Sequence, residues 1–238
     1  MQKNILITGK PRSGKSTLLQ KLINVIPNKV GFITKEILEN NERVGFEIET
    51  HLGKKNVLAH INFKTPNAVS RYFVNVENLE AMIPEVVDFQ NDNFLYLDEI
   101  GQMELFSAKF KELVLKYLNS ENICLAIISN VFEDDFIKSI KAREDVIVIE
   151  ISEENRDEQE KFVTQLIRKI EKAKKYILEP QRFSITNSKV ELKSEHATRT
   201  LVLIDKKWEC DCDFFREHQI CSHTIATKEL IKNKSNLI

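Results

Sequence analysis

The chain has 238 residues, of which 42% are hydrophobic and 30% are charged, and its 35 Lys+Arg and 36 Asp+Glu residues leave a net charge of -1. This composition fits a globular protein of one large domain or two, and it excludes a polybasic nucleic-acid binder. The N-terminal apolar run is too short for a signal peptide and no run approaches a membrane span, so we expect a cytoplasmic protein without membrane contact.

A glycine-rich loop lies between the first two predicted elements, a strand at 5–8 and a helix at 16–26. Its pattern, Gly9-x4-Gly14-Lys15-Ser16, is that of a phosphate-binding loop. The glycines allow a tight turn whose N–H groups face phosphate oxygens. Lys15 supplies positive charge, and the Ser16 hydroxyl can bind Mg²⁺. The predicted nucleotide-binding run is Gly9, Lys10, Pro11, Arg12, Ser13, Gly14, Lys15, Ser16 and Thr17.

The next segment is predicted to be a β-meander beside the main sheet, because alternating apolar and polar residues are typical of half-buried strands. Its three strands are predicted at 29–39, 44–50 and 57–63, followed by a loop at 65–72 and a helix at 78–87.

Strands and helices then alternate, which predicts an α/β P-loop fold with a mostly parallel sheet and helices on both faces. Cys124 is interpreted as a small apolar filler within one of these strands. The strands are predicted at 94–97, 123–128 and 146–151, and the helices at 108–118, 136–142 and 157–177.

An acidic pair, Asp98-Glu99, follows the buried strand at 94–97. Because burying carboxylates is costly, their position needs an explanation. Asp98 can hold Mg²⁺ together with Ser16, and Glu99 can orient or deprotonate an attacking water molecule. A solvated turn is the alternative interpretation, and the phosphate-binding loop in the same chain favours the functional one.

The first ~178 residues resemble the small nucleoside-triphosphatase family that includes cancer-related nucleoside-triphosphatase. Departures at Val69-Ser70-Arg71-Tyr72, Asn75 and Ser129-Asn130 bear on base preference and rate. The matching stretches, besides the phosphate-binding loop, are Gly31-Phe32-Ile33-Thr34-Lys35-Glu36, Arg43-Val44-Gly45-Phe46, Asn75-Val76-Glu77, Asp98-Glu99-Ile100-Gly101-Gln102-Met103-Glu104-Leu105-Phe106, Ile140-Lys141-Ala142-Arg143 and Asn155-Arg156-Asp157.

This resemblance implies Mg²⁺-dependent hydrolysis of nucleoside triphosphates such as ATP and GTP, with loose base choice. Lys15 and Glu99 would be the catalytic residues, with Glu99 beside the Mg²⁺ ligand Asp98. The resemblance further implies that Asn155 and Arg156 lie near the base or ribose, and that Arg143 reaches a phosphate.

Pro180 cannot continue the last helix, so we expect a boundary between a domain at 1–179 and a second domain at 180–238. The second domain places Cys210-Asp211-Cys212 eight residues before Cys221-Ser222-His223. Three thiolates and an imidazole suit a closed tetrahedral Zn²⁺ site, and so small a domain needs such a staple. A disulfide pair, free thiols, or His218 as a ligand are the alternatives.

This pattern resembles the SWIM zinc finger, including an apolar strand before it and a short helix after it, which implies a ββα module that binds DNA or protein. Lys206, Lys207, Arg216, Lys228, Lys232 and Lys234 form either a basic binding face or an ordinary solvated surface.

Two functions are consistent with these features. The first is a Mg²⁺-dependent nucleoside-triphosphatase whose zinc finger recruits nucleic acid or a protein. The second is a nucleotide-gated binding protein with slow hydrolysis as a timer. A kinase is disfavoured, because Glu99 stands where water activation is expected and the sequence reveals no acceptor pocket.

Overall fold

The computed structural model describes residues 1–235, with side chains described through residue 233. The chain falls into two compact units, a large one formed by Lys3–Gln159 and a small one formed by Met1–Gln2 with Glu160–Ile238. The units divide within a long helix rather than at Pro180 behind it. The boundary at Pro180 therefore stays a prediction about which parts fold independently.

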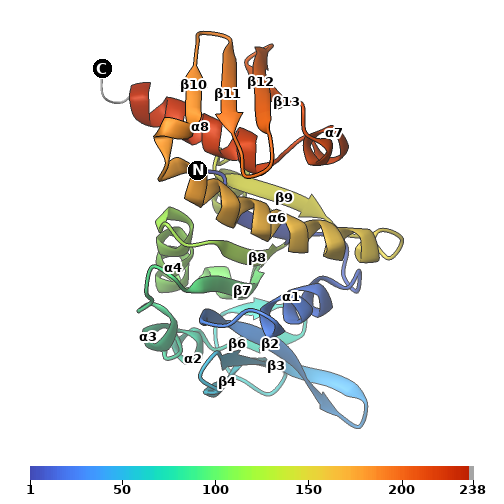
Figure 1. The fold of residues 1–238 in the computed structure, drawn as a ribbon. Helices are drawn as coiled ribbons and strands as arrows, with labels where there is room; N and C mark the ends of the chain where they lie inside the picture. The colour runs from blue at the N-terminus through green and yellow to red at the C-terminus, as the bar shows by residue number, and fades with distance from the viewer. Residues whose placement is uncertain (236–238) are drawn as a thin grey trace. The chain divides into compact units, whose positions relative to one another are not determined.

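The large unit is built on a nine-stranded sheet with the strand order β5-β6-β4-β3-β2-β7-β8-β1-β9 (Figure 1). The strands from β2 to β9 in this order pair in parallel, whereas β3 to β6 form an antiparallel meander that extends the sheet beyond β2. The strands are β1 (Asn4–Thr8), β2 (Lys29–Glu39), β3 (Glu42–Thr50), β4 (Lys55–His60), β5 (Ala68–Val69), β6 (Tyr72–Val74), β7 (Phe94–Ile100), β8 (Cys124–Ile128) and β9 (Val146–Glu150).

Helices cover both faces of this sheet, as the βαβ alternation predicts. Leu6 of β1 packs with the buried residues of α2 to α5 in one apolar core. Its neighbours Ile5 and Ile7 are equally buried but point to the other face, where α1 contributes Leu19. The helices are α1 (Lys15–Asn24), α2 (Val76–Glu80), α3 (Ile83–Val86), the 3₁₀ turn η1 (Glu104–Phe106), α4 (Ala108–Asn119), α5 (Asp135–Lys141) and α6 (Arg156–Ile177), of which α6 continues into the small unit.

The small unit contains a four-stranded antiparallel sheet in the order β10-β11-β12-β13. A two-residue turn, Asp205-Lys206, joins strands β12 and β13. Both of its residues adopt positive φ, as the turn that matches the right-handed twist of a hairpin requires. The elements after α6 are the 3₁₀ turn η2 (Pro180–Arg182), β10 (Phe183–Ile185), β11 (Lys189–Lys193), β12 (Thr198–Ile204), β13 (Lys207–Cys210), α7 (Asp213–His218) and α8 (Ser222–Ser235).

The structure differs from the sequence expectations mainly in short elements. The expected loop at 65–72 contains β5 and the start of β6, and the expected helix at 78–87 is two short helices, with Pro84 in the first turn of the second. After Pro180 the sequence predicts strands at 183–190 and 200–208, with a possible turn at Asn187-Ser188. The structure forms a hairpin at each place, β10–β11 and β12–β13. No helix in the described part of the chain combines the length and apolar character that crossing a bilayer requires.

Candidate functional site

The phosphate-binding loop joins the end of β1 at Thr8 to the start of α1 at Lys15. Gly9 is required because a Cβ at this position would lie 2.2 Å from the carbonyl oxygen of Ile151. Gly14 caps α1 with φ of 97°, a conformation that costs glycine little. The first turn of α1 thus presents its N–H groups at the loop, as anion binding requires.

Lys15 crosses its own loop and donates from Nζ to the carbonyl oxygens of Gly9 and Lys10, at 2.9 Å each. Burial lowers the pKa of Lys15, while the charges of Glu99 and Asp98 act in the opposite direction. The ammonium group therefore lies between the loop and the acidic pair, where the terminal phosphates of a bound triphosphate belong.

Asp98, near the end of β7, is held between two hydroxyl groups. Ser16 Oγ donates to its Oδ1 at 3.1 Å, and Thr34 Oγ1 donates to its backbone carbonyl. The side chain is 3% exposed, and among the described residues Oδ2 has no hydrogen-bond partner. Burial raises the pKa of Asp98 to about 7. A buried, unpaired carboxylate oxygen beside a serine hydroxyl fits a Mg²⁺ ligand pair, because Mg²⁺ takes oxygen ligands.

Two further carboxylates extend this acidic site. The carboxylates of Glu99 and Glu104 both lie over Gly101, where a Cβ would stand 3.2 Å from Glu99 Oε1 and 3.2 Å from Glu104 Oε2. Burial raises the pKa of Glu99. Burial and the charge on Glu99 raise the pKa of Glu104 to about 8. Glu99 is thus a stronger base than an exposed carboxylate, which suits proton abstraction near neutral pH.

A cavity of about 550 Å³ opens over the phosphate-binding loop and the acidic site. Lys15, Ser16, Asp98 and Glu99 all line it, so the structure brings together the residues expected to bind phosphate and Mg²⁺. The volume lies within the range of roughly 300–1,000 Å³ that is common for small-molecule pockets.

Asn155 ends the loop after β9 and Arg156 begins α6, next to the phosphate-binding loop. Asn155 shapes its own loop, since its Oδ1 accepts from Ser152 N at 2.8 Å and its Nδ2 donates to Glu150 O at 3.2 Å. The Arg156 side chain passes Gly14, with its Cδ 3.7 Å from where a Cβ would stand. Arg156 therefore borders the loop on the β9 side.

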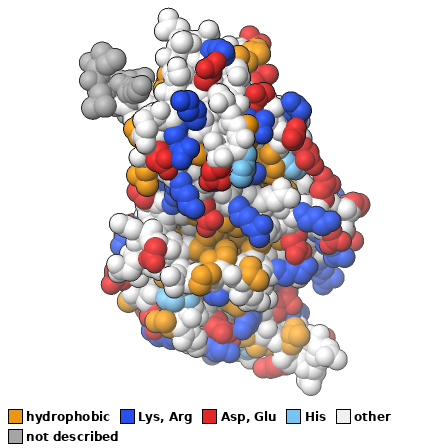
Figure 2. Space-filling view, viewed as in Figure 1, with side chains coloured by type: hydrophobic (Ala, Val, Ile, Leu, Met, Phe, Trp, Pro, Cys, Tyr) orange, Lys and Arg blue, Asp and Glu red, His pale blue; other side chains and the backbone are white. Residues whose placement is uncertain are grey.

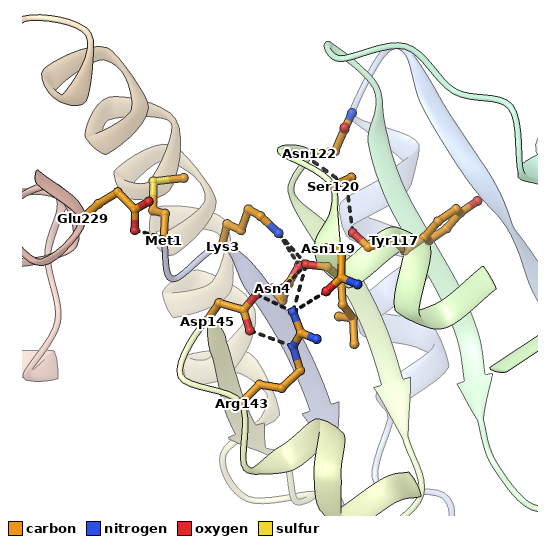
Figure 3. Close-up of polar contacts among 11 residues, drawn as sticks. Met1, Lys3, Asn4, Tyr117, Asn119, Ser120, Asn122, Arg143, Asp145 and Glu229 are labelled. Atoms are coloured by element: carbon orange, nitrogen blue, oxygen red, sulfur yellow. Dashed lines mark hydrogen bonds and ion pairs between the residues drawn. The ribbon is translucent and has the colours of Figure 1, made fainter. Parts of the chain in front are cut away.

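Arg143 does not join this site, contrary to the implied phosphate contact. Its guanidinium donates from Nε and Nη2 to the two carboxylate oxygens of Asp145, at 2.8 Å each, and from Nη2 to Asn119 Oδ1 at 2.9 Å (Figure 3). The backbone of Asp145 pairs with Lys3 and Asn4 at the start of β1. Because the phosphate-binding loop follows the other end of β1, Arg143 is a structural residue at the opposite edge of the sheet.

Comparisons with known proteins agree with this geometry. Residues 4–178 match the model of a protein family described as NTPase. That match covers well over half of the chain. The chain belongs to this NTPase family.

Relatives of this NTPase include the nucleoside-triphosphatase THEP1 of Thermotoga maritima, which is 41% identical over 155 residues that span 64% of this chain and 88% of the relative. THEP1 of Natranaerobius thermophilus is 38% identical over 66% of this chain and 92% of its own.

The crystal structure of THEP1 from Aquifex aeolicus superposes with a TM-score of 0.62 at 32% identity, covering 69% of this chain and 98% of that one. A human cancer-related nucleoside triphosphatase superposes with a TM-score of 0.59 at 26% identity, covering 69% of this chain and 97% of that one. The fold expected for the large unit is thereby confirmed.

The NTPase carries a second candidate site in its small unit, where four buried side chains converge. The ligand atoms of Cys210, Cys212, Cys221 and His223 all lie within 4.8 Å of one another, and all three cysteines are free thiols. His223 Nδ1 is 3.5 Å from Cys210 Sγ and 3.7 Å from Cys221 Sγ. Tetrahedral Zn²⁺ at 2.3 Å from sulfur separates its ligands by about 3.7 Å, so the donor set and its spacing fit this ion.

Local structure brings the two Cys/His pairs of this second site together. β13 ends at Cys210, the chain bends at Asp211, and α7 then leads back toward Cys221. Hydrogen bonds from Cys210 and Cys221 lower the pKa of Cys212, which favours a thiolate. Tyr176 of α6 stacks on the imidazole of His223, with ring centroids 5.8 Å apart.

His218, considered as an alternative ligand, is occupied elsewhere in the small unit. Its ring lies 4.6 Å from that of Phe162 and 4.5 Å from that of Phe214. Among the described residues, the group that could hold a metal comprises the other four side chains.

The suggested basic face contains acidic neighbours. Arg216 is paired with Asp213 at 2.9 Å, and Lys228 donates to Gln2 at 3.2 Å. On the face shown in Figure 2, basic and acidic side chains are interspersed over the surface. Lys234 lies outside the described side chains.

Sequence reasoning did not assign a role to Thr34, Arg43 or Phe46, all of which line the cavity. They stand in β2 and β3, remote in sequence from both the phosphate-binding loop and Asp98-Glu99. The stretches that contain them were part of the family resemblance, and that was the available signal.

Proposed function

We propose that the chain is a Mg²⁺-dependent nucleoside-triphosphatase that releases phosphate from the terminal position of ATP, GTP and related nucleotides. The observation that carries this proposal is the contact of Ser16 Oγ with Asp98 Oδ1 at 3.1 Å, which links the phosphate-binding loop to the acidic pair. The second oxygen of Asp98 is buried without a hydrogen-bond partner among the described residues, and a bound cation would supply the missing partner.

Each residue then has a distinct role. Lys15 and the loop N–H groups bind the β- and γ-phosphates. Ser16 and Asp98 would hold Mg²⁺, which supplies positive charge against the phosphate oxygens. Glu99 takes a proton from the water molecule that attacks the γ-phosphorus, and the bond from that phosphorus to the β–γ bridging oxygen breaks.

The family resemblance assigns base and ribose binding to Asn155 and Arg156, and the Arg156 side chain passes Gly14 at 3.7 Å from where a Cβ would stand. The side chain of Asn155 is hydrogen-bonded to backbone groups of its own loop. Arg156 is therefore the residue whose side chain can contact the nucleotide. A single flexible side chain discriminates poorly between purine and pyrimidine bases, which supports hydrolysis of several nucleoside triphosphates.

The test is steady-state phosphate release from ATP, GTP, CTP and UTP, with Mg²⁺ and with EDTA. Release should require Mg²⁺ and should be lost in Lys15→Ala, which removes the cation at the β- and γ-phosphates. Release that persists in EDTA, or in Lys15→Ala purified in the same way, would show that hydrolysis does not occur at this loop.

For the small unit, we propose a structural Zn²⁺ site formed by Cys210, Cys212, Cys221 and His223, in a SWIM-like module that begins near Pro180 and recruits nucleic acid or a protein partner. Four protein ligands leave no open position, so the ion would stabilise rather than catalyse. In the alternative, this module binds its partner only when the large unit holds nucleotide. Phosphate release measured with and without DNA or RNA distinguishes the enzyme from the nucleotide-gated binding module, because constitutive turnover favours the enzyme.

A cytoplasmic location is part of the same proposal.

A further inference from the structure

The two units of the chain carry opposite net charges. Positions 160–238 hold 16 Lys/Arg and 11 Asp/Glu residues, a net charge of +5, whereas the rest of the chain has a net charge of -6. Most of this positive excess lies at 160–182, which has seven basic and three acidic residues. The basic character of the small unit therefore belongs to α6 and the turn after it, rather than to the part that contains the cysteines.

Three cations of α6 form one row on its exposed side. Lys161, Arg168 and Lys175 are exposed and follow one another at intervals of seven residues. Seven residues are close to two helical turns, so these side chains project from the same side at steps of about 10.5 Å. We call this row the α6 stripe. The buried residues of α6 lie on its other side and are Val163, Leu166, Ile167, Ile170, Ala173 and Tyr176.

The cations of the α6 stripe are available to an external anion. Lys172, beside the stripe, is paired with Glu195 at 3.0 Å. None of the ion pairs in the described part of the chain involves a stripe residue. Exposed Glu171 stands between Arg168 and Lys175 in the sequence and pairs with neither. A stripe cation can therefore bind a phosphate without first breaking an internal ion pair.

The surface around the α6 stripe offers no apolar anchor. Between positions 161 and 175, all of them described, no large hydrophobic side chain is exposed. Phe162 packs against Phe214 and His218, with ring centroids 6.3 Å and 4.6 Å away. A protein interface is anchored by large apolar or aromatic side chains, and a helix on a membrane inserts an apolar face. A single strand stacks its bases on exposed aromatic rings, so the stripe suits none of these partners.

A nucleic-acid duplex is the partner that charge alone can bind. It carries one phosphate charge per about 1.7 Å of its axis, and contacts to these phosphates supply nearly all of non-specific affinity. The stripe extends over 14 residues, or about 21 Å, of one continuous helix. α6 thus holds three cations at fixed steps beside a rod of about 12 phosphate charges.

We propose that the α6 stripe binds the phosphate backbone of a nucleic-acid duplex without regard to base sequence. The proposal deepens the proposed function, on which it rests, because it names the partner of the small unit and places the contact on α6 instead of on the cysteine-containing module. Three phosphate contacts predict a slope of about -2.7 for the logarithm of the binding constant against the logarithm of salt concentration. Raising salt from about 20 mM to about 100 mM should then weaken binding roughly 80-fold.

The experiment titrates the full chain into a fluorescently labelled DNA duplex of about 20 base pairs, long enough to cover the stripe, and follows anisotropy over this range of salt. We expect the slope given above, and equal affinity for duplexes of unrelated sequence. Each of Lys161→Gln, Arg168→Gln and Lys175→Gln should reduce the slope by about 0.9. The triple variant should show no salt-dependent binding.

The matched control compares two double variants that remove the same charge. Arg168→Gln with Lys175→Gln should reduce the slope by about 1.8, whereas Lys206→Gln with Lys207→Gln, two exposed cations of the β12–β13 turn, should leave it unchanged. All four positions are exposed, and far-UV circular dichroism checks that both variants fold. Equal losses in the two double variants would overturn the stripe, since binding would then follow net charge alone.

Two further measurements separate this proposal from its competitors. Tighter binding to a single strand, or to vesicles containing phosphatidylserine, than to the duplex would overturn the proposal. Phosphate release is measured on the same preparation. Protein that releases phosphate but does not bind the duplex would overturn the stripe and leave hydrolysis intact, whereas protein that binds the duplex through the stripe but releases no phosphate would refute the proposed hydrolysis alone.

Discussion

Glu104 offers a direct test of the electrostatics of the acidic site. Its side chain is 4% exposed and shares the space over Gly101 with Glu99. Burial raises the pKa of Glu104 to about 8 from an ordinary value of 4.5. Between these two values the native state holds a proton that the unfolded chain has released. Stability must therefore fall as pH rises through this window.

The size of the effect follows from the two pKa values. Between about pH 5.5 and about pH 8, the ionisation of Glu104 should lower the free energy of unfolding by about 3 kcal/mol. Glu104→Gln keeps an acceptor for the Gly101 N–H but cannot ionise. The advantage of the variant over the parent should therefore grow by about 3 kcal/mol between about pH 5.5 and about pH 8.

The assay is urea unfolding of nucleotide-free protein at both pH values, followed by far-UV circular dichroism, because the single tryptophan, Trp208, lies in the small unit. Glu80→Gln is the control without a pH effect in this window. Hydrogen bonds from Lys109 and Ser107 lower the pKa of Glu80, so Glu80 is ionised in the folded and the unfolded chain at both pH values, and removing its charge should change stability equally at the two. Equal pH dependence in the parent and in Glu104→Gln would refute the burial of an acid at this position.

Three further predictions concern the two sites. Glu99→Gln should keep nucleotide binding but lower kcat by about 10²–10⁴-fold, the usual contribution of a general base; phosphate release beside nucleotide titration tests this, and near-normal turnover would transfer the role to Glu104. Arg156→Ala should change KM or the preference among ATP, GTP, CTP and UTP more than the Mg²⁺ requirement, and an unchanged profile would remove Arg156 from the nucleotide site. Cys212→Ser, like chelation, should abolish Zn²⁺ content measured by mass spectrometry and shift Trp208 fluorescence while phosphate release continues, since a small finger takes much of its folding free energy from the metal; retained zinc would contradict the ligand set.

The sequence predicted those parts of the fold and site that depend on local patterns. The phosphate-binding loop has a fixed spacing between a strand and a helix, and a run of apolar residues predicts a strand buried on both faces, so Ser16 and Asp98 could be paired before the structure was known. The cysteine cluster was predictable because three cysteines and a histidine close together in the sequence are typical ligands of a zinc site.

What could not be predicted depends on how distant strands pair. Thr34 reaches Asp98 because β2 lies beside β7, and no local pattern encodes that neighbour. The family resemblance implied that Arg143 reaches a phosphate, but Asp145 two residues later holds it at the far end of the strands. The hairpin turn at Asp205-Lys206 was not predicted, because these two residues carry no glycine or proline signal.

Cys124 lies in β8, apart from the other three cysteines, and is 1% exposed. Burial raises its pKa to about 12, so this thiol is almost never a thiolate at neutral pH and is inert to labelling reagents. Thiol counting therefore resolves the state of each unit in one experiment. Metal-loaded native protein should label at none of its cysteines, metal-free native protein at three, and denatured protein at four. The number of labelled cysteines in one sample thus reports separately on occupancy of the proposed Zn²⁺ site and on unfolding of the large sheet.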